Sequence, residues 1–166
     1  MIKTENCQTL RNQHNLNSSD PPLLDLPALI VSSSEEETFA LGKRIALLLE
    51  KGAVVALRGP LGAGKTCLAK GLAQGIGIAD EITSPTYAII SEYKAFVPFY
   101  HIDAYRLKGN DDFSAIGGEE IVFGDGISVI EWSERIPDFI PLEAFRIDFE
   151  ITGENKRRIH IYKGNK

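Results

Sequence analysis

The 166-residue chain contains little of what a disulfide-stabilised or metal-cluster protein needs. Its two cysteines, Cys7 and Cys67, are far apart in the sequence and form no CxxC motif. This excludes a disulfide framework and a cysteine-based metal site, and favours a reducing cytoplasm as the compartment. The three histidines are equally scattered, so the sequence predicts no histidine metal cluster.

The chain also lacks long apolar runs and an excess of positive charge. No apolar run approaches the roughly 20 residues that span a bilayer, and the amino terminus lacks the basic and apolar regions of a signal peptide. We therefore expect a soluble protein without membrane contact. The net charge of −5 argues against a protein that grips nucleic acid alone, because such binding depends on Lys and Arg. Any role in RNA chemistry would need a partner.

The first 32 residues show no helical or strand periodicity. They are rich in Asn, Gln, Ser and Asp, and Pro21, Pro22 and Pro27 break any helical pattern, which is typical of a flexible tail. The chain as a whole has the length and the 43% hydrophobic content of one globular domain. The sequence thus predicts a polar tail over 1–32 and a single domain over 33–166.

The domain begins with an amphipathic helix followed by a buried strand. Ser34 and Glu37 have capping-box spacing, and an apolar stripe at helical period continues until Gly52. The apolar run 53–57 leads into glycines and indicates a strand buried on both faces; residues 67–74 then continue as a helix. A short helical stretch is predicted around 111–121. Further strands are predicted over 87–93, 97–102, 127–130, 145–151 and 158–162.

Between the first strand and its helix, residues 59–66 read GPLGAGKT and match the P-loop pattern. The loop residues expected to bind phosphates through backbone N–H groups are Leu61, Gly62, Ala63 and Gly64. Lys65 would reach the β- and γ-phosphates as a catalytic charge, and the Thr66 hydroxyl would join the Mg²⁺ shell. A chance glycine-rich turn is the alternative, but the strand and helix on either side favour a nucleotide site. We expect an α/β fold, a single P-loop NTPase-like domain whose central mixed sheet has few helices and extra late strands.

Two carboxylates end predicted strands. Asp103 and Glu131 would each emerge at the carboxyl edge of the sheet, where α/β folds bind ligands. P-loop enzymes use such an acidic residue to hold Mg²⁺ or its water. Either residue could instead be a strand-end charge or a helix cap. His101, which alternates with Asp103, could serve as a base or ligand, although a lone strand histidine is more typical of packing.

Four other residues have two interpretations each. Ser84 and Thr86 lie between the P-loop helix and the next strand, where hydroxyls could sense the γ-phosphate; a proline-stiffened turn is the alternative. Trp132 follows Glu131 directly and either fills the core or stands beside the nucleotide. Cys67 could be a thiolate favoured by the helix amino end, but a small packed residue is the favoured interpretation.

Taken together, these segments resemble one family, the bacterial tRNA threonylcarbamoyladenosine biosynthesis ATPases TsaE, formerly YjeE. The resemblance covers about residues 33–162, with Tyr87 standing where many relatives have Phe. It rests on segments in the family's order and approximate spacing: GPLGAGKT at 59–66, SPTY at 84–87, HIDAYRL at 101–107, GGEE at 117–120, GDGISVIEW at 124–132 and ER at 134–135.

The resemblance implies roles for the candidates named so far. Lys65 and Thr66 keep the roles given above, Glu131 coordinates Mg²⁺, and Asp103 is required for hydrolysis. Which of the two carboxylates positions the attacking water stays open. The family's first helix also approaches the nucleotide base. The residues that the resemblance places near the nucleotide, besides the P-loop, are Ser34, Glu35, Ser84, Thr86 and Trp132.

The implied function is that of a cytoplasmic, Mg²⁺-dependent ATPase in tRNA modification. With TsaD and TsaB proteins, the family supports formation of the threonylcarbamoyl group on adenosine next to the anticodon of tRNAs that read codons beginning with A. Contact with tRNA would be indirect, in keeping with the acidic charge. We expect slow hydrolysis by the isolated chain, because the sequence places no obvious arginine finger.

Three other functions remain open on the residues alone. A small-molecule kinase would need an Arg-bearing lid, whereas the later half of the chain is rich in strands. A GTPase would need an Asn-Lys-x-Asp motif, which is absent, so ATP is favoured over GTP. A nucleotide-gated binding module would use ATP only to control docking. The basic end could contact RNA or a partner, or be a solvated face; its residues are Lys156, Arg157, Arg158, Lys163 and Lys166.

Overall fold

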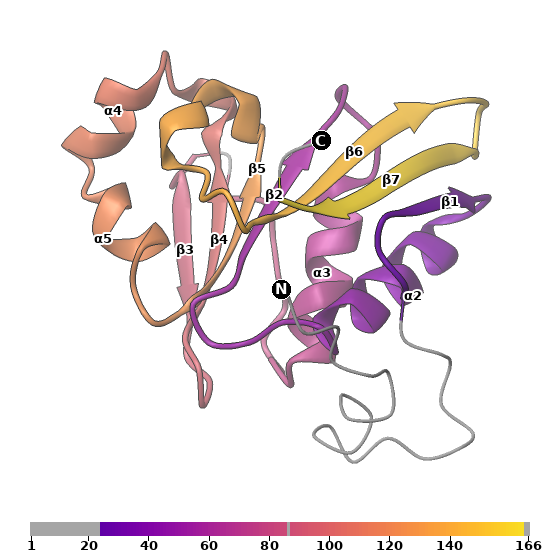
Figure 1. Cartoon of the computed structure of the whole chain (residues 1–166), viewed down its shortest axis with the longest axis horizontal. Coiled ribbons are helices and arrows are strands. Elements are labelled where there is room, and N and C mark those ends of the chain that lie inside the picture. The colour runs from indigo at the N-terminus through magenta and orange to yellow at the C-terminus, as the bar shows by residue number, and fades with distance from the viewer. Residues whose placement is uncertain (1–23, 86, 165–166) are drawn as a thin grey trace, which may run out of the picture.

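The computed structural model describes residues 24–85 and 87–164. Seven strands form one mixed sheet in the order β1-β7-β6-β2-β5-β4-β3 (Figure 1). The expected α/β class, with a central mixed sheet and late strands, is therefore confirmed. The strands are β1 (Ala28–Ser32), β2 (Val54–Arg58), β3 (Ile90–Tyr93), β4 (Phe99–Asp103), β5 (Ile127–Glu131), β6 (Phe145–Ile151) and β7 (Arg157–Lys163).

The middle of the sheet is parallel, and its two edges are antiparallel. β2 pairs in parallel with both β5 and β6, and β4 pairs in parallel with β5. The pairs β1–β7, β6–β7 and β3–β4 are antiparallel. Parallel strands end at the same edge of a sheet, so β2, β4 and β5 bring the P-loop, Asp103 and Glu131 to one carboxyl edge.

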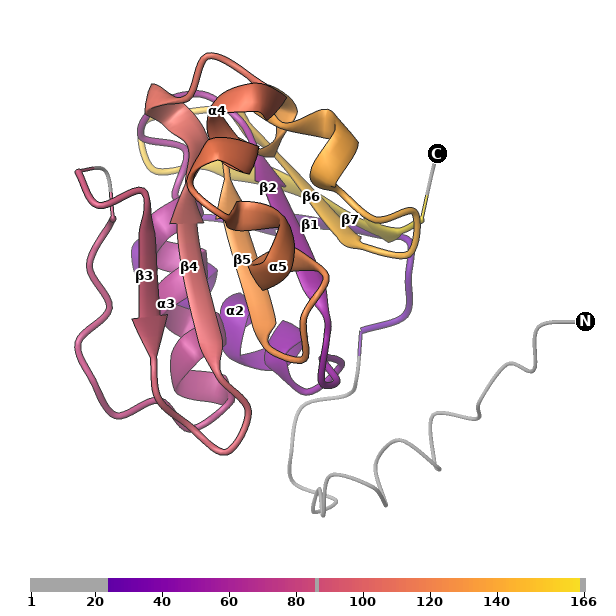
Figure 2. The same cartoon turned by 90° about the vertical axis from the view of Figure 1, so that its left-hand side faces the viewer.

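Helices cover both faces of the sheet (Figures 1 and 2). α2 (Glu35–Ala46) and α3 (Lys65–Gly75) pack against each other on one face, while α4 (Asn110–Ala115) and α5 (Gly118–Val122) lie on the other. Alternate residues of β2 supply two separate cores: Val55 and Leu57 face α2 and α3, and Val54 and Ala56 face the opposite way. Within the described residues, none of the helices has the length and apolar content that crossing a membrane requires.

The first helix begins where the capping pattern predicts. The Ser34 hydroxyl accepts a hydrogen bond from the backbone N–H of Glu37 at 3.2 Å, and the Glu37 carboxylate accepts one from the backbone N–H of Ser33. The regular helix ends at Ala46, earlier than the apolar stripe suggests. Leu48 and Leu49 then bond to carbonyls three residues back, so the stripe continues through a tighter turn.

The predicted boundary between tail and domain is corrected by β1. This strand lies within the segment assigned to the tail, yet it pairs along its whole length with β7. Proline at position 27 suggested a break, but a proline is compatible with the start of an edge strand. The pairing partner is distant in the sequence, so local patterns could not reveal it. The other part of the predicted tail, residues 1–23, lies outside the described residues.

Two later elements also differ from their predicted extents. β3 begins at Ile90 rather than at residue 87, because Ile89 has a left-handed backbone (φ 66°) that interrupts the extended conformation. The helical stretch around 111–121 consists of α4 and α5, separated at Gly117, whose φ of 73° ends the first of them. Short 3-10 helices follow β4 and β5: η1 (Ala104–Arg106), η2 (Ser133–Arg135) and η3 (Pro137–Phe139).

Candidate nucleotide site

The P-loop connects β2 to α3 and requires glycine at two positions for different reasons. At Gly59, an added Cβ would lie 2.8 Å from the Cβ of Phe149 on β6, so only glycine allows this close approach. Gly64 has a φ of 100°, which side-chain-bearing residues rarely adopt, and it caps α3 without any side-chain bond. The first turn of α3 contains no acidic residue, so the positive end of the helix dipole is available for an anion.

Lys65 is buried at the start of α3, with only 4% of its surface exposed. Its ammonium group donates hydrogen bonds to the carbonyls of Gly59 at 2.8 Å and Pro60 at 2.9 Å. It also lies 4.0 Å from the centre of the Trp132 ring, a cation–π contact. Burial lowers the pKa of Lys65, while nearby carboxylates act in the opposite direction. The amine is thus held by its own loop and is only partly compensated by negative charge.

Thr66 and Glu131 meet across the gap between α3 and β5. The Thr66 hydroxyl donates to the Glu131 carboxylate, with distances of 2.8 Å to Oε1 and 3.0 Å to Oε2. His101 on β4 reaches the same carboxylate, with its Nε2 2.8 Å from Oε1. Glu131 is almost fully buried, so these contacts compensate its loss of hydration. The hydroxyl and the carboxylate form a pair of oxygen donors beside the P-loop.

Asp103 connects the end of β4 to the segment before β3. Its Oδ1 accepts a hydrogen bond from the backbone N–H of Tyr105 at 3.0 Å, which caps the 3-10 helix η1. Its Oδ2 accepts one from the Ser84 hydroxyl at 3.2 Å. The capping role, which the sequence left open, is therefore present. The same carboxylate also faces the cavity described below.

Trp132 has a left-handed backbone, with φ 58° and ψ 40°, which is uncommon for a bulky side chain. Its ring contacts both the Lys65 amine and the ring of Tyr105, whose centre is 5.0 Å away. It also packs at the margin of the core under α4 and α5. Trp132 therefore packs at the margin of the core and also beside Lys65, and its place beside the nucleotide stays a prediction.

A cavity of about 360 Å³ lies over the P-loop at the carboxyl edge of the sheet. Nearly all of the candidates from the sequence line it. Ser34 lines a smaller hollow of about 90 Å³ beside the P-loop, together with Glu35 and Arg157. Thr86 lies outside the described residues. The residues around the main cavity are Glu35, Leu61, Gly62, Ala63, Gly64, Lys65, Thr66, Cys67, Ser84, Asp103, Tyr105, Glu131 and Trp132.

The donor set suits magnesium rather than a transition metal. Among the residues that the structure describes, no three His, Cys, Asp or Glu side chains are grouped so as to hold a metal ion. Mg²⁺ needs only one or two protein oxygens when phosphates and waters complete its shell. The Thr66 hydroxyl and Glu131 carboxylate supply such oxygens next to the phosphate loop. A nucleotide with Mg²⁺ therefore fits the residues that are present.

The chain resembles known proteins over most of its length. A family model described as "Threonylcarbamoyl adenosine biosynthesis protein TsaE" matches residues 32–159. The chain belongs to the TsaE family. The TsaE protein of Treponema pallidum is 44% identical over 131 residues, which are 79% of this chain and 97% of that protein. The TsaE protein of Bacillus subtilis is 39% identical over 125 residues, which are 75% of this chain and 78% of that protein.

A solved structure shares the same architecture. The crystal structure of YdiB from Bacillus subtilis superposes with a TM-score of 0.68 at 33% identity, covering 86% of this chain and 90% of that one. The resemblance inferred from sequence motifs is thus confirmed by sequence and by fold. Membership in the TsaE family is consistent with a nucleotide-binding protein of tRNA processing.

Arg157 lies beside the site in this TsaE chain, although the sequence indicated it only as part of a basic end. It begins β7, and one guanidinium nitrogen donates to the carbonyl of Gly62 in the P-loop at 3.1 Å. Sequence spacing does not predict this contact, because Arg157 and Gly62 are far apart in the sequence and are brought together by the pairing of strands in the sheet. Cys67, in contrast, is half-buried: its thiol donates to the carbonyl of Glu35, and burial raises its pKa, which disfavours the reactive thiolate.

Proposed function

We propose that this chain is a Mg²⁺-dependent ATPase. It would support formation of threonylcarbamoyladenosine next to the anticodon of tRNAs that read codons beginning with A, acting with TsaD and TsaB proteins. Family membership supports the pathway, and the relatives carry the corresponding name. The observation that carries the chemistry is the convergence of Lys65, Thr66 and Glu131 on one cavity at the carboxyl edge.

Each of these residues has a role that follows from its chemistry. The Lys65 ammonium exchanges its two loop carbonyls for the β- and γ-phosphates, a favourable exchange because phosphate oxygens carry full negative charge. Thr66 and Glu131 would hold Mg²⁺, which would neutralise negative charge on the phosphates. Asp103 acts on the attacking water, since its carboxylate lines the cavity, whereas Glu131 is the carboxylate that is hydrogen-bonded to the Thr66 hydroxyl and is therefore assigned to the metal.

The remaining candidates support the nucleotide around this centre. Leu61, Gly62, Ala63 and Gly64 present backbone N–H groups to the phosphates. Ser84 links its segment to Asp103, a connection suited to sensing the γ-phosphate. The smaller hollow, which is lined by Ser34, Glu35 and Arg157, is the site for the base and ribose.

Hydrolysis by the isolated chain is slow in this proposal. Among the described residues, no arginine lines the main cavity, so no arginine finger stabilises the transferred phosphoryl group from within the chain. Two apolar side chains, Leu61 at the cavity and Tyr87 three residues after Ser84, are 81% and 90% exposed. A partner that docks over them would exclude water from the nucleotide and complete the site.

The proposal is tested by hydrolysis and tRNA modification assays with the purified chain, TsaD and TsaB proteins, tRNA and ATP. We expect the partners to stimulate hydrolysis, and Asp103→Asn to abolish turnover while ATP binding persists. The matched control Asp25→Asn, at the opposite edge of the sheet, should behave as the wild type.

Fast hydrolysis without partners, or phosphate transfer to a small molecule, would contradict this function. A second candidate, the nucleotide-gated docking module, is separated by the same variant. If Asp103→Asn supports full tRNA modification over many rounds, docking alone is sufficient and turnover is incidental.

A further inference from the structure

His101 is a fully buried histidine for which the proposed function has no role so far. It lies in β4 opposite Val129 of β5, and β5 separates β4 from the P-loop strand β2. Its Nε2 is 2.8 Å from Oε1 of Glu131, and its exposed surface is 0%. Both groups have lost their hydration on burial, and the hydrogen bond between them offsets part of that cost.

The direction of the hydrogen bond follows from the acceptor. An ionised carboxylate can only accept, so Nε2 must carry the proton and donate it to Glu131. The other ring nitrogen, Nδ1, is buried and has no hydrogen-bond partner among the described residues. The contact to Glu131 is therefore the hydrogen bond that fixes this ring among the described residues.

The contact with His101 gives the two Glu131 oxygens different hydrogen-bonding environments. Oε1 accepts from both Thr66 and His101, each at 2.8 Å, so its two lone-pair directions are occupied. Among the described residues, Oε2 only shares the Thr66 hydroxyl proton, at the longer distance of 3.0 Å. The rotation of the carboxylate is thereby fixed, and Oε2 retains acceptor capacity for a cation or for one of its waters.

We propose that His101 is a positioning residue for Mg²⁺: its Nε2–H holds the Glu131 carboxylate in the orientation that receives the metal. The inference rests on the proposed function, because it assumes that Glu131 contributes to Mg²⁺ binding. Metal-binding side chains are commonly oriented in this way by a second hydrogen-bonding partner, and loss of that partner weakens metal binding about 10- to 100-fold. A histidine that only fills space would show no such effect.

The donor can be removed or retained by substitution. His101→Leu removes it at similar volume, whereas His101→Gln places an amide N–H near the position of Nε2. The quantity to measure is the ratio of the ATP dissociation constants in EDTA and in Mg²⁺, obtained by calorimetric titration. We expect the ratio to fall about 10- to 100-fold in His101→Leu with unchanged affinity in EDTA. His101→Gln should recover most of the wild-type ratio.

The matched control is His160→Gln, a histidine on β7 that packs against Tyr162 and has no contact with Glu131. It should leave the ratio unchanged. A folded His101→Leu chain with the wild-type ratio would overturn the inference. So would equal losses in the Leu and Gln variants, because they would indicate a role of shape rather than of the donor.

A second measurement needs no variant of His101 and no nucleotide. Nitrogen-15 NMR of the histidine rings in the wild-type chain reports which ring nitrogen is protonated, with the other rings assigned by His14→Gln and His160→Gln. We expect Nε2 of His101 to carry a proton. Protonation at Nδ1 alone would overturn the inference even if His101→Leu does not fold.

The two measurements distinguish a failure of this inference from a failure of the proposed function on which it rests. A wild-type chain that binds ATP equally well with and without Mg²⁺ would overturn the metal role of Glu131 and, with it, the role of His101. If ATP binding by the wild-type chain depends on Mg²⁺ as expected and the His101 variants show the same dependence, only the positioning role is overturned. ATP hydrolysis and tRNA modification would then stand as proposed.

Discussion

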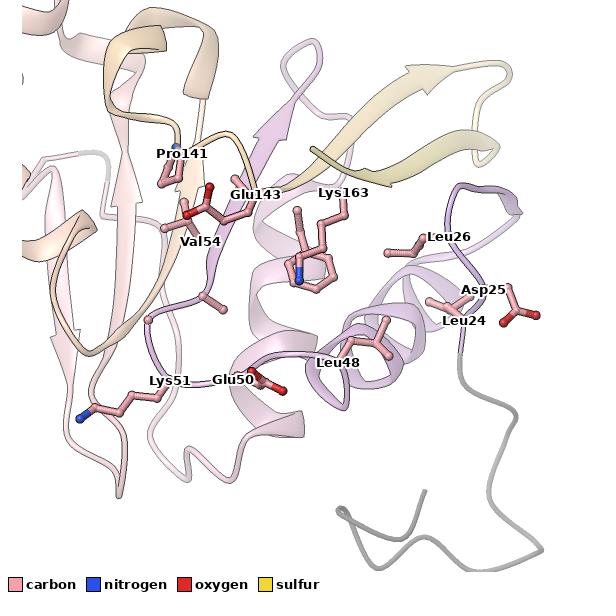
Figure 3. A pocket seen from close by; sticks show the side chains of 14 residues that line it. Leu24, Asp25, Leu26, Leu48, Glu50, Lys51, Val54, Pro141, Glu143 and Lys163 are labelled. Carbon is pink, nitrogen blue, oxygen red and sulfur yellow. The ribbon is translucent and has the colours of Figure 1, made fainter. Parts of the chain in front are cut away.

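The two edges of the parallel strands each have a cavity, and the larger cavity has the less specific chemistry. At the amino edge, about 460 Å³ is enclosed by the starts of β2 and β6 and by apolar side chains such as Leu24, Leu26 and Leu48 (Figure 3). At the carboxyl edge, about 360 Å³ lies over the P-loop. On volume alone, the amino-edge cavity would be chosen as the functional site.

The difference lies in the buried polar groups. Lys65, Asp103 and Glu131 line the carboxyl-edge cavity and are nearly fully buried. None of the described residues around the amino-edge cavity is a buried charged group. The Lys51 side chain extends away from the cavity (Figure 3). Its amine lies 2.8 Å from Asp125, and the Lys163 amine lies over the ring of Phe145. Buried charge is costly unless a ligand or partner uses it, so the carboxyl edge is the functional one.

The largest contrast between the edges is expected from removing one carboxylate charge at each. Glu131→Gln should reduce the Mg²⁺-dependent gain in ATP affinity at least about 100-fold, because a direct metal ligand contributes more than its orienting partner. Glu143→Gln, at the amino-edge cavity, should leave both affinity and hydrolysis unchanged. Calorimetry with and without Mg²⁺ measures both. Equal effects of the two substitutions would remove the distinction between the edges.

A smaller contrast is expected in cysteine reactivity. In a Cys7→Ser chain, alkylation reports on Cys67 alone, which lines the carboxyl-edge cavity. Burial and Glu35 raise its pKa, so at pH 8 its thiolate fraction, and hence its rate, should be below that of an unperturbed thiol, and the rate should keep rising toward pH 10. Saturating ATP should slow it further by several-fold.

The matched probe for the amino edge is Leu48→Cys in a chain that also carries Cys7→Ser and Cys67→Ala. Its alkylation rate should be the same with and without ATP, because Leu48 lies at the other end of the sheet. Mass spectrometry of the alkylated protein measures both rates. Protection of Leu48→Cys by ATP, without protection of Cys67, would place the nucleotide at the wrong edge.

The sequence predicted the parts of this molecule that depend on local order. A P-loop has a fixed spacing, and Asp103 and Glu131 each end an apolar strand, so their meeting at one edge follows from parallel pairing. The helix start at Ser34 was equally local. Functional residues that lie within a few positions of the end of a helix or strand can be predicted from such local patterns.

What could not be predicted depends on pairings between distant segments. β1 was assigned to the tail because its surroundings are polar and contain prolines, whereas its pairing partner, β7, lies at the other end of the chain. Arg157 reaches Gly62 by the same route. The bond between His101 and Glu131 joins two strands, and a lone histidine in a strand gives no sign of whether a carboxylate faces it. The orienting contacts of the site therefore required the structure, whereas its principal groups did not.

The central claim is that Lys65 grips a nucleotide at the carboxyl edge, and calorimetric titration of ATP with Mg²⁺ into the folded Lys65→Ala chain tests it most directly. Lys51→Ala, at the amino edge, is the control. We predict that Lys65→Ala loses ATP affinity at least about 100-fold, since a buried charge-assisted contact of about 3 kcal/mol disappears, while Lys51→Ala binds as the wild type. Unchanged ATP affinity in a folded Lys65→Ala chain would contradict the account.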